Sequence, residues 1–150
     1  MRLSEAHGLN ARAFSRDCAM HQDLRPRVLL ADDHIDVLSA VQRMLEPSCE
    51  VVDRVTNGAA VLERVEHLMP DVVVLDITMP GLNGLEVCRQ IKTAMPDIPV
   101  VILTANNDPE IKKSAFGAGA SSFVLKHSMA NDLLPAVRKA FFGDARAEQA

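Results

Sequence analysis

Four short apolar runs of this sequence end in polar or charged residues, and these end residues are the ones that could do chemistry. The runs lead into Asp32-Asp33, Asp76, Thr104 and Lys126. Three carboxylates with a hydroxyl and an ammonium can hold a divalent cation and neutralise a phosphoryl group. A polar residue that ends one strand is ordinarily the boundary with solvent. Four strands that end in complementary groups instead indicate a functional site.

Three carboxylates that lie close together repel one another. Either one of them takes up a proton at a raised pKa, or a divalent cation lies between them. Oxygen ligands favour a hard cation, and Mg²⁺ is usually held by a few carboxylates and waters. With the negative charge neutralised, Asp76 can act as a nucleophile. Lys126 can then pair with one phosphoryl oxygen as a point charge, and Thr104 can donate a hydrogen bond to another.

These groups can meet only if the elements that carry them form one sheet. Strands and helices alternate along the chain, which predicts an α/β fold of the flavodoxin-like kind. The five-stranded parallel sheet has the order 2-1-3-4-5, with helices on both faces, so the carboxyl ends of strands one, three, four and five are adjacent. The predicted strands are Val28–Asp32, Glu50–Val55, Val72–Leu75, Val100–Leu103 and Ser122–Leu125. The predicted helices are Ile35–Leu45, Ala59–Leu68, Gly84–Ala94, Pro109–Phe116 and Ala130–Phe141, and Gly143 is a stop signal.

The bulk composition excludes several classes of protein. The net charge is −4 without a basic block, which favours neither nucleic acid nor an anionic membrane as a partner. No apolar stretch approaches the roughly 20 residues of a membrane span. Cys18, Cys49 and Cys88 form no C-x-x-C pair, which suits the reducing cytoplasm and argues against a disulfide framework or a structural zinc site. We expect residues 1–25 to be a flexible tail, 26–143 one domain, and 144–150 a C-terminal tail or linker stub.

Residues 27–143 resemble the receiver domain of bacterial two-component response regulators, in particular those attached to helix-turn-helix transcription regulators. The matching segments are residues 28–34, 75–84, 103–105 and 119–126. The resemblance implies that Asp76 accepts phosphate from a sensor histidine kinase or a phosphotransfer protein. It implies that Asp33 and Asp76 bind Mg²⁺ directly, that Asp32 does so partly through water, and that Thr78 contributes its backbone carbonyl.

The resemblance also implies a switch. Thr104 would move toward the aspartyl phosphate while Phe123 changes rotamer, and the face of the fourth helix, fifth strand and fifth helix would be remodelled for a partner. Thr78 and Asn106 stand where receivers tune the lifetime of the phosphate. Such a domain is not an enzyme beyond its own Mg²⁺-dependent phosphorylation and dephosphorylation. The resemblance leaves open a homodimer and a DNA-binding domain elsewhere in the natural protein, while this chain itself makes no DNA contact.

Two rival functions are weighed against this one. A receiver that acts as a protein-interaction module without phosphorylation is opposed by the complete set of site residues. A metal-dependent phosphatase with an aspartyl nucleophile would need a second acid where Thr78 stands. One departure from the family pattern is His127, because many receivers have a proline after the lysine, so the local loop is expected to differ.

Several other residues admit a functional and a structural interpretation. His34 is interpreted as a solvated loop histidine rather than a zinc ligand. Phe141 and Phe142 are expected to pack the last helix onto the sheet. Recognition of the kinase is expected around Ile35, Val37 and Leu38 of the first helix.

Overall fold

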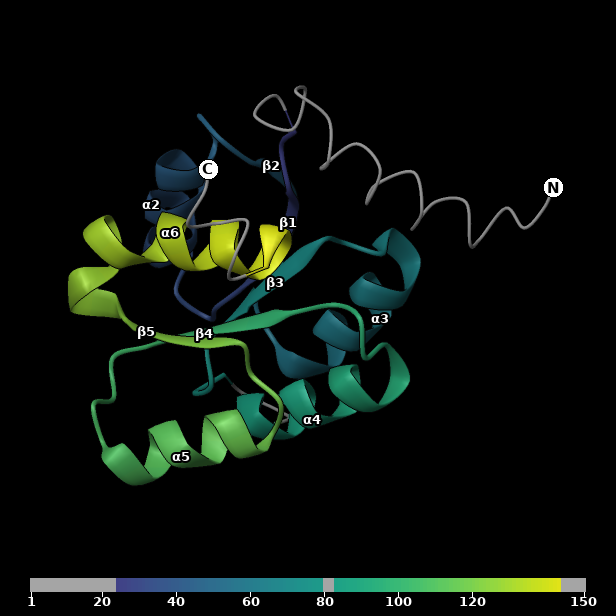
Figure 1. Ribbon diagram of the computed structural model, residues 1–150, viewed down its shortest axis with the longest axis vertical. Coiled ribbons are helices and arrows are strands. Elements are labelled where there is room, and N and C mark those ends of the chain that lie inside the picture. Colours follow the sequence, from purple (N-terminus) through teal and green to yellow (C-terminus); the bar gives the residue numbers. More distant parts are fainter. Residues whose placement is uncertain (1–23, 80–82, 144–150) are drawn as a thin grey trace, which may run out of the picture.

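Five parallel strands form the centre of the computed structural model, which describes residues 24–79 and 83–143 (Figure 1). Their order is β2-β1-β3-β4-β5, so the predicted sheet topology is confirmed. Strand β2 lies at one edge, and a register shift between Val28 and Leu29 interrupts its pairing with β1. The strands are β1 (Arg27–Ala31), β2 (Glu50–Val55), β3 (Val72–Leu75), β4 (Val100–Thr104) and β5 (Ser122–Leu125).

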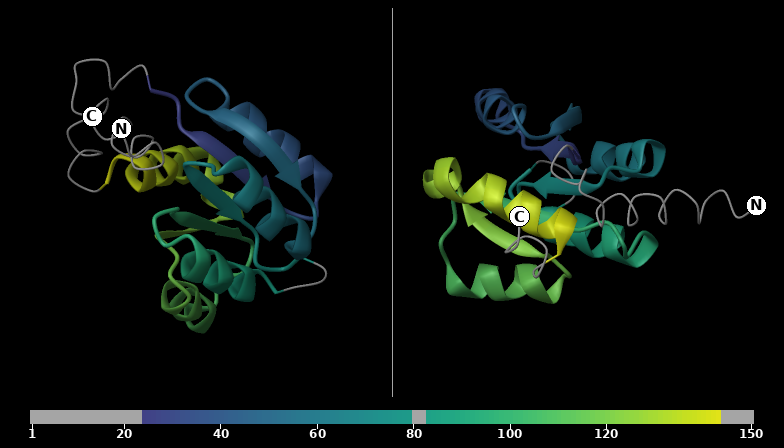
Figure 2. Two further views of the ribbon diagram at one scale, coloured as in Figure 1. Left: turned by 90° about the vertical axis from the view of Figure 1, so that its right-hand side faces the viewer. Right: turned by 45° about the horizontal axis from the view of Figure 1, so that its top comes forward.

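Helices cover both faces of the sheet (Figure 2). Successive residues of a strand point to opposite faces, so each buried strand contributes to two cores. Leu30 and Val74 pack with α2 and α6, whereas Leu29 and Val73 pack with α3, α4 and α5. The helices are α2 (Ile35–Leu45), α3 (Gly58–Leu68), α4 (Gly84–Ala94), α5 (Pro109–Gly117) and α6 (Met129–Phe142), and a short 3₁₀ turn, η2 (Lys126–Ser128), precedes the last of them.

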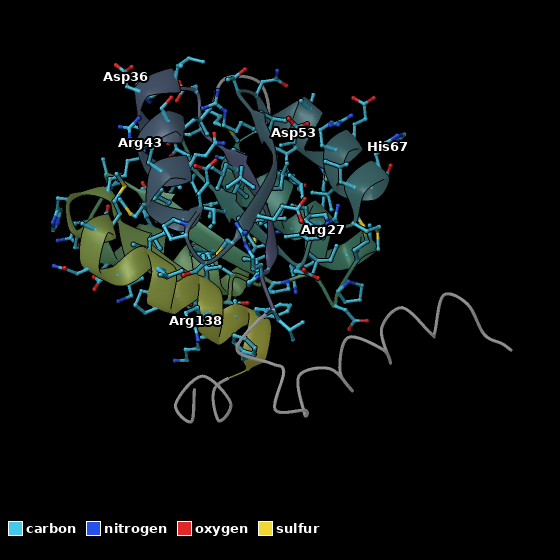
Figure 3. The ribbon with its side chains drawn as sticks, turned by 90° about the horizontal axis from the view of Figure 1, so that it is seen from above. Arg27, Asp36, Arg43, Asp53, His67 and Arg138 are labelled. Atoms are coloured by element: carbon cyan, nitrogen blue, oxygen red, sulfur yellow. The ribbon has the colours of Figure 1, made fainter. Side chains whose placement is uncertain are left out.

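Three of these helices begin at a residue whose side chain caps the first turn. The side chains of Asn57, Asn83 and Asp108 accept hydrogen bonds from backbone N–H groups in the first turns of α3, α4 and α5. These bonds satisfy donors that a helix start leaves without partners. The end of α3 is held from another element. The guanidinium of Arg27, a residue of β1 that is labelled in Figure 3, donates to the carbonyl oxygens of Leu68 and Met69 at 2.9 and 3.1 Å.

The last helix differs from the prediction at both ends. It runs from Met129 to Phe142 instead of Ala130–Phe141, and it contains Pro135, with Gly143 as its C-cap. Burial of the apolar stripe on α6 outweighs the local cost of a proline in a helix interior. Phe141 and Phe142 are buried and meet edge to face with centroids 4.8 Å apart, so the packing interpretation is confirmed.

Smaller differences concern element ends. Helix α3 starts at Gly58 rather than Ala59, α5 continues to Gly117, and Thr104 belongs to β4 instead of following it. Of the predicted tails, 1–25 and 144–150, residues 1–23 and 144–150 lie outside the described residues. Arg25, at the end of the predicted N-terminal tail, donates hydrogen bonds to the carbonyl oxygens of Glu46 and Cys49 and so is tied to the domain. Among the helices that the structure describes, none is long and apolar enough to cross a membrane.

Candidate functional site

The acid pair lies where β1 ends and α2 begins. Asp32 follows the strand directly and its side chain is only 3% exposed, while that of Asp33 is 28% exposed. Asp32 Oδ1 accepts a hydrogen bond of 2.8 Å from the backbone N–H of His34. The imidazole Nδ1 of His34 lies 3.2 Å from the same oxygen and 3.0 Å from Asp33 Oδ1. The turn into α2 therefore holds both carboxylates at the carboxyl end of the sheet.

Asp76 lies at the end of β3, next to the acid pair. Strands β1 and β3 are neighbours with Ala31 opposite Leu75, so the residues that follow them come side by side. The Asp76 side chain is 1% exposed. The backbone N–H and the hydroxyl of Thr78 both donate to Asp76 Oδ1, at 3.2 and 3.1 Å. The carboxylate is thus oriented by its own loop before any ligand binds.

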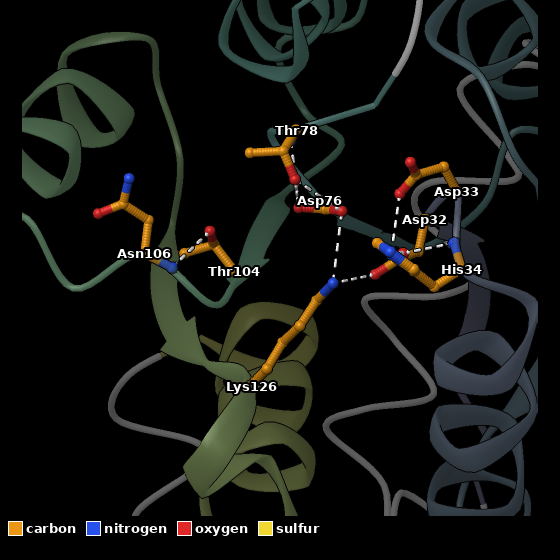
Figure 4. A network of polar contacts seen from close by, with 8 residues as sticks. All are labelled: Asp32, Asp33, His34, Asp76, Thr78, Thr104, Asn106 and Lys126. Atoms are coloured by element: carbon orange, nitrogen blue, oxygen red, sulfur yellow. Dashed lines mark hydrogen bonds and ion pairs between the residues drawn. The ribbon is translucent and has the colours of Figure 1, made fainter.

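Lys126 brings a positive charge from the end of β5. Its Nζ lies 2.7 Å from Asp32 Oδ2 and 3.4 Å from Asp76 Oδ2, so one ammonium lies between two strand-end carboxylates (Figure 4). His127, in the place of the proline of many receivers, continues from Lys126 into the η2 turn, and every peptide bond between described residues is trans. The ammonium reaches the acids without the cis peptide that such a proline can provide.

Burial and neighbouring groups of opposite charge act in opposite directions on the pKa values of Asp76 and Lys126. Burial raises the pKa of Asp76, and the charge of Asp32 raises it further, whereas Lys126 and the Thr78 hydrogen bonds lower it. For Lys126, burial lowers the pKa, but the neighbouring carboxylates of Asp32 and Asp76 outweigh it and leave the pKa raised. The lysine therefore keeps its charge at neutral pH, and Asp76 is a more basic carboxylate than a solvated aspartate.

Thr104 and Phe123 lie on neighbouring strands of the same region. Thr104 is fully buried, and its hydroxyl accepts a hydrogen bond of 3.1 Å from the backbone N–H of Asn106 (Figure 4). Phe123 is half-buried and packs against the core on the side of α3, α4 and α5. Both stand on elements beside the acidic pocket, and the roles given to them by resemblance stay predictions.

The chemistry of the donor set fits a divalent cation. Asp32, Asp33, His34 and Asp76 each offer one ligand atom within 4.8 Å of the others. Asp33 Oδ1 is buried without a well-directed hydrogen bond in the described part of the chain and has the His34 ring as its close polar neighbour, whereas Asp32 Oδ2 has the Lys126 ammonium at 2.7 Å. A buried carboxylate oxygen without a hydrogen bond is costly unless a cation binds it. The site is typical of the Mg²⁺ site of receiver domains.

Two contacts of the site were not foreseen, and one surface assignment was wrong. The hydroxyl of Thr78 bonds to Asp76, although the residue was singled out for its backbone carbonyl. His34 is exposed at 64%, as a solvated histidine should be, yet its ring contacts both acids of the pair. Leu38, grouped with a kinase-facing surface, is 2% exposed and faces the core, so that assignment was wrong, while Ile35 is 58% exposed. Side-chain rotation decides the two contacts, and no sequence pattern encodes it.

Residues 28–138 match the response regulator receiver domain family, and the chain belongs to this family. It is 34% identical over 119 residues to the response regulator GacA of Pseudomonas aeruginosa, covering 78% of this chain and 56% of that protein. It is 31% identical over 113 residues to the DNA-binding transcriptional activator EvgA of Escherichia coli K12, covering 75% and 55%. The chain thus spans about half the length of the curated relatives it matches.

Solved structures agree with this assignment. A two-component response regulator of the LuxR family from Aurantimonas sp. SI85-9A1 superposes with a TM-score of 0.76 at 30% identity, over 80% of this chain and 87% of that one. The isolated receiver domain of RcsB from Salmonella enterica serovar Typhimurium, with the phosphomimetic BeF₃⁻, gives 0.75 at 26% identity, over 84% and 98%. The chain is a receiver domain related to those of LuxR-family DNA-binding response regulators.

Proposed function

We propose that this receiver takes a phosphoryl group from a phosphohistidine onto Asp76 and thereby switches a protein-binding or dimerisation surface. The supporting observation is the placement of the Lys126 ammonium between the carboxylates of Asp32 and Asp76, beside Asp33. Asp32 and Asp76 are both nearly fully buried and held by their own loops, but Asp32 is already paired with Lys126 at 2.7 Å, whereas Asp76 is oriented by Thr78 and lies 3.4 Å from the ammonium. Asp76 is the group that the site prepares as a nucleophile.

The transfer requires little of the protein beyond positioning and charge. An oxygen of ionised Asp76 attacks phosphorus, an O–P bond forms, and the N–P bond to the donor imidazole breaks with its electron pair left on nitrogen. Thr78 holds Oδ1, and Oδ2 faces Lys126 at 3.4 Å. The ammonium is therefore placed to pair with an oxygen of the arriving group. The Thr104 hydroxyl, whose oxygen accepts from Asn106, keeps its own hydrogen to donate to a second oxygen.

The carboxylates of Asp33 and Asp76 would hold Mg²⁺ directly, with Asp32 partly through water and Thr78 through its carbonyl. When bound there, Mg²⁺ neutralises the negative charge that would otherwise repel a phosphoryl donor. Asp32 keeps its ion pair with Lys126 at 2.7 Å, which suits a ligand that acts through water rather than by direct contact.

The output proposed is a rearrangement of Thr104 and Phe123 that alters the face of α5, β5 and α6. Phe116 of α5 is 45% exposed, which gives that face an apolar side chain for a partner to cover. The partners are a sensor histidine kinase or phosphotransfer protein, together with a second copy of the chain as a dimer mate. We assign the protein to the cytoplasm. We also assign the receiver to residues 26–143 between two tails, and place any DNA contact outside this chain.

Phosphorylation with acetyl phosphate and Mg²⁺ tests the proposal. Intact mass should show one phosphoryl group that hydroxylamine removes, as expected of an acyl phosphate. Asp76→Asn should abolish the gain, whereas Asp97→Asn, an exposed carboxylate beyond the end of α4, should leave it unchanged. A folded wild-type protein that gains no mass, or an Asp76→Asn variant that still gains it, contradicts the proposal. The first of these results would favour a receiver that signals without phosphorylation.

A further inference from the structure

We infer that Asn106 positions the Thr104 hydroxyl for the phosphoryl group, because its side chain fixes the turn of backbone from which its own N–H reaches that hydroxyl. The inference rests on the proposed function in taking Thr104 as a donor to a phosphoryl oxygen. It differs from the role that the resemblance gives to Asn106, which is to tune the lifetime of the phosphate directly. Asn106 is here a positioning residue, since it acts through Thr104.

Three hydrogen bonds in a row lead from Thr104 to the start of α5, and each spans two residues. The backbone N–H of Asn106 donates to Thr104 Oγ1 at 3.1 Å. The N–H of Asp108 donates to Asn106 Oδ1, and that of Glu110 to Asp108 Oδ1, both at 2.9 Å. Asn and Asp side chains commonly hold the backbone two residues further on in this way. Asn106 takes part in two of the three bonds, with its N–H toward Thr104 and its side chain toward Asp108.

The segment between β4 and α5 has few other contacts to fix its backbone. Residues 105–110 are all exposed. Neither Asn106 nor Asn107 forms a backbone–backbone hydrogen bond with the described part of the chain. The row ends at Asp108, the N-cap of α5, whose carbonyl oxygen accepts from the N–H of Lys112 at 3.1 Å. Side-chain bonds anchored on α5 therefore determine where the Asn106 N–H points.

The orientation of the Thr104 hydroxyl depends on that N–H. Thr104 is fully buried, and the bond from Asn106 is the one hydrogen bond of its hydroxyl among the described residues. A hydroxyl oxygen that accepts from a fixed N–H keeps its own hydrogen for another acceptor. Thr104 lies opposite Leu125 in the sheet, one residue before the lysine that pairs with Asp76. The free hydrogen is thus held at the sheet edge where the phosphoryl group would arrive.

The amide of Asn106 does not serve the phosphoacceptor directly. Figure 4 shows this amide directed away from the Asp76 carboxylate. Its Oδ1 already accepts from the N–H of Asp108. An amide oxygen that held a hydrolytic water at Asp76 would have to give up that bond. The geometry favours an action of Asn106 through Thr104 over an action at the phosphate.

Side-chain NMR of the full chain tests the positioning itself. Three-bond couplings to the Thr104 methyl carbon report the χ1 rotamer of this side chain. We expect one rotamer in the wild type and averaging between rotamers in Asn106→Ala. Asn107→Ala is the matched control, because it removes an exposed asparagine of the same segment whose side chain makes no hydrogen bond with the described residues, and it should keep the single rotamer. An unchanged Thr104 rotamer in Asn106→Ala would overturn the inference.

Phosphorylation kinetics test the consequence. With acetyl phosphate and Mg²⁺, Asn106→Ala should slow the gain of mass about fivefold, the factor that one hydrogen bond contributes, whereas Asn107→Ala should keep the wild-type rate. Thr104→Val removes the hydroxyl and keeps the shape of the side chain. If Asn106 acts through that hydroxyl, Asn106→Ala should slow the Thr104→Val protein no further. An equal loss on both backgrounds would overturn the inference, because Asn106 would then act independently of Thr104.

The inference can fail while the proposed function holds. A wild type and an Asn106→Ala variant that are labelled at the same rate reject only the role of Asn106. Absence of labelling in the wild type rejects the phosphoacceptor function. The Thr104 rotamer, measured without Mg²⁺ or acetyl phosphate, still tests the positioning by Asn106 in that case.

Discussion

Gly84 is the residue whose replacement should reveal how tightly the fold holds the nucleophile. It opens α4 and lies against the strand end that carries Asp76. A Cβ built on Gly84 would meet the Cα of Ile77 and would come within 2.5 Å of the Asp76 carbonyl oxygen. Ordinary contact begins at 3.4 Å, so that carbonyl would have to retreat by about 0.9 Å. Gly84→Ala therefore moves the backbone of the phosphoacceptor rather than a flexible side chain.

Two opposing effects set the change in stability. Overpacking costs typically about 1–3 kcal/mol, and a glycine replaced by alanine in a helix returns at most about 1 kcal/mol. Gly84→Ala should therefore lower the free energy of unfolding by up to about 3 kcal/mol, with a value of about 2 kcal/mol expected. A displacement near 1 Å at a reacting group can cost about 100-fold in rate. We expect phosphorylation by acetyl phosphate to slow by about that factor.

Urea unfolding followed by circular dichroism measures the stability, because the chain has no Trp or Tyr for fluorescence. The phosphorylation rate comes from intact mass against time. Gly117→Ala is the matched control, since a Cβ there meets nothing within 4 Å. It should keep the wild-type rate and change the stability by less than about 1 kcal/mol. A folded Gly84→Ala protein that is phosphorylated at the wild-type rate would refute this account of the loop.

Three further substitutions and one ligand addition have predicted outcomes. Asp76→Asn should raise the melting temperature of the metal-free protein, because burial and Asp32 raise the pKa of Asp76 and so make its ionised form unfavourable in the folded state. Excess Mg²⁺ should raise the melting temperature of the wild type by several degrees and that of this variant much less. Pro135→Ala should stabilise the protein to urea by about 1–2 kcal/mol. Pro135 is exposed within α6, and a proline costs about 3 kcal/mol in a helix interior, which exceeds the stabilisation it gives by reducing the conformational entropy of the unfolded chain. Burial raises the pKa of Cys49 to about 11. The free energy of unfolding of the wild type is therefore complete below pH 9 and falls as the pH rises toward 11, by about 1 kcal/mol at pH 10. Cys49→Ala should remove this alkaline loss of stability.

Each of the three substitutions has a result that contradicts its prediction. A lower melting temperature of metal-free Asp76→Asn would show that the Lys126 pair outweighs the burial of the acid. Unchanged or reduced stability of Pro135→Ala would show that α6 is already kinked to suit the proline. The free energy of unfolding is measured at pH 8 and pH 10 for the wild type and for Cys49→Ala. An equal decrease in the two proteins would show that the Cys49 thiol ionises alike in the folded and unfolded states.

The sheet could be predicted because its signals are redundant. Apolar runs, turn residues and right-handed crossovers each favour the same order of strands, and α2 and α4 were placed to the residue. Helix α6 was predicted through Pro135 and differs by one residue at each end, although a proline within a helical pattern ordinarily ends the helix. There the buried stripe of Leu133, Val137 and Phe141 prevails over Pro135. Long-range burial decides such boundaries, and a local pattern cannot weigh it.

The site was predictable in its membership but not in its contacts. Strand ends determine that the three acids and Lys126 gather, because parallel strands in this order share one edge. The Lys126 ammonium lies closer to Asp32 (2.7 Å) than to Asp76 (3.4 Å), and this difference depends on side-chain torsions and on the balance of charges in the pocket. The same holds for the hydroxyl of Thr78. Backbone topology follows from sequence pattern, whereas hydrogen-bond partners within a pocket follow from packing.

The ion pairs of the pocket indicate how it responds to a cation. Asp32, Asp76 and Asp33 already have positive or polar neighbours from the chain itself, namely Lys126, Thr78 and His34. A cation therefore enters a site whose carboxylates are oriented, and little backbone ordering is needed for it to bind. The contacts that must change are those of His34 and Lys126, which face the oxygens a cation and a phosphoryl group would use. Ion binding and phosphorylation should consequently perturb the same two side chains, and a signal from either residue should report both events.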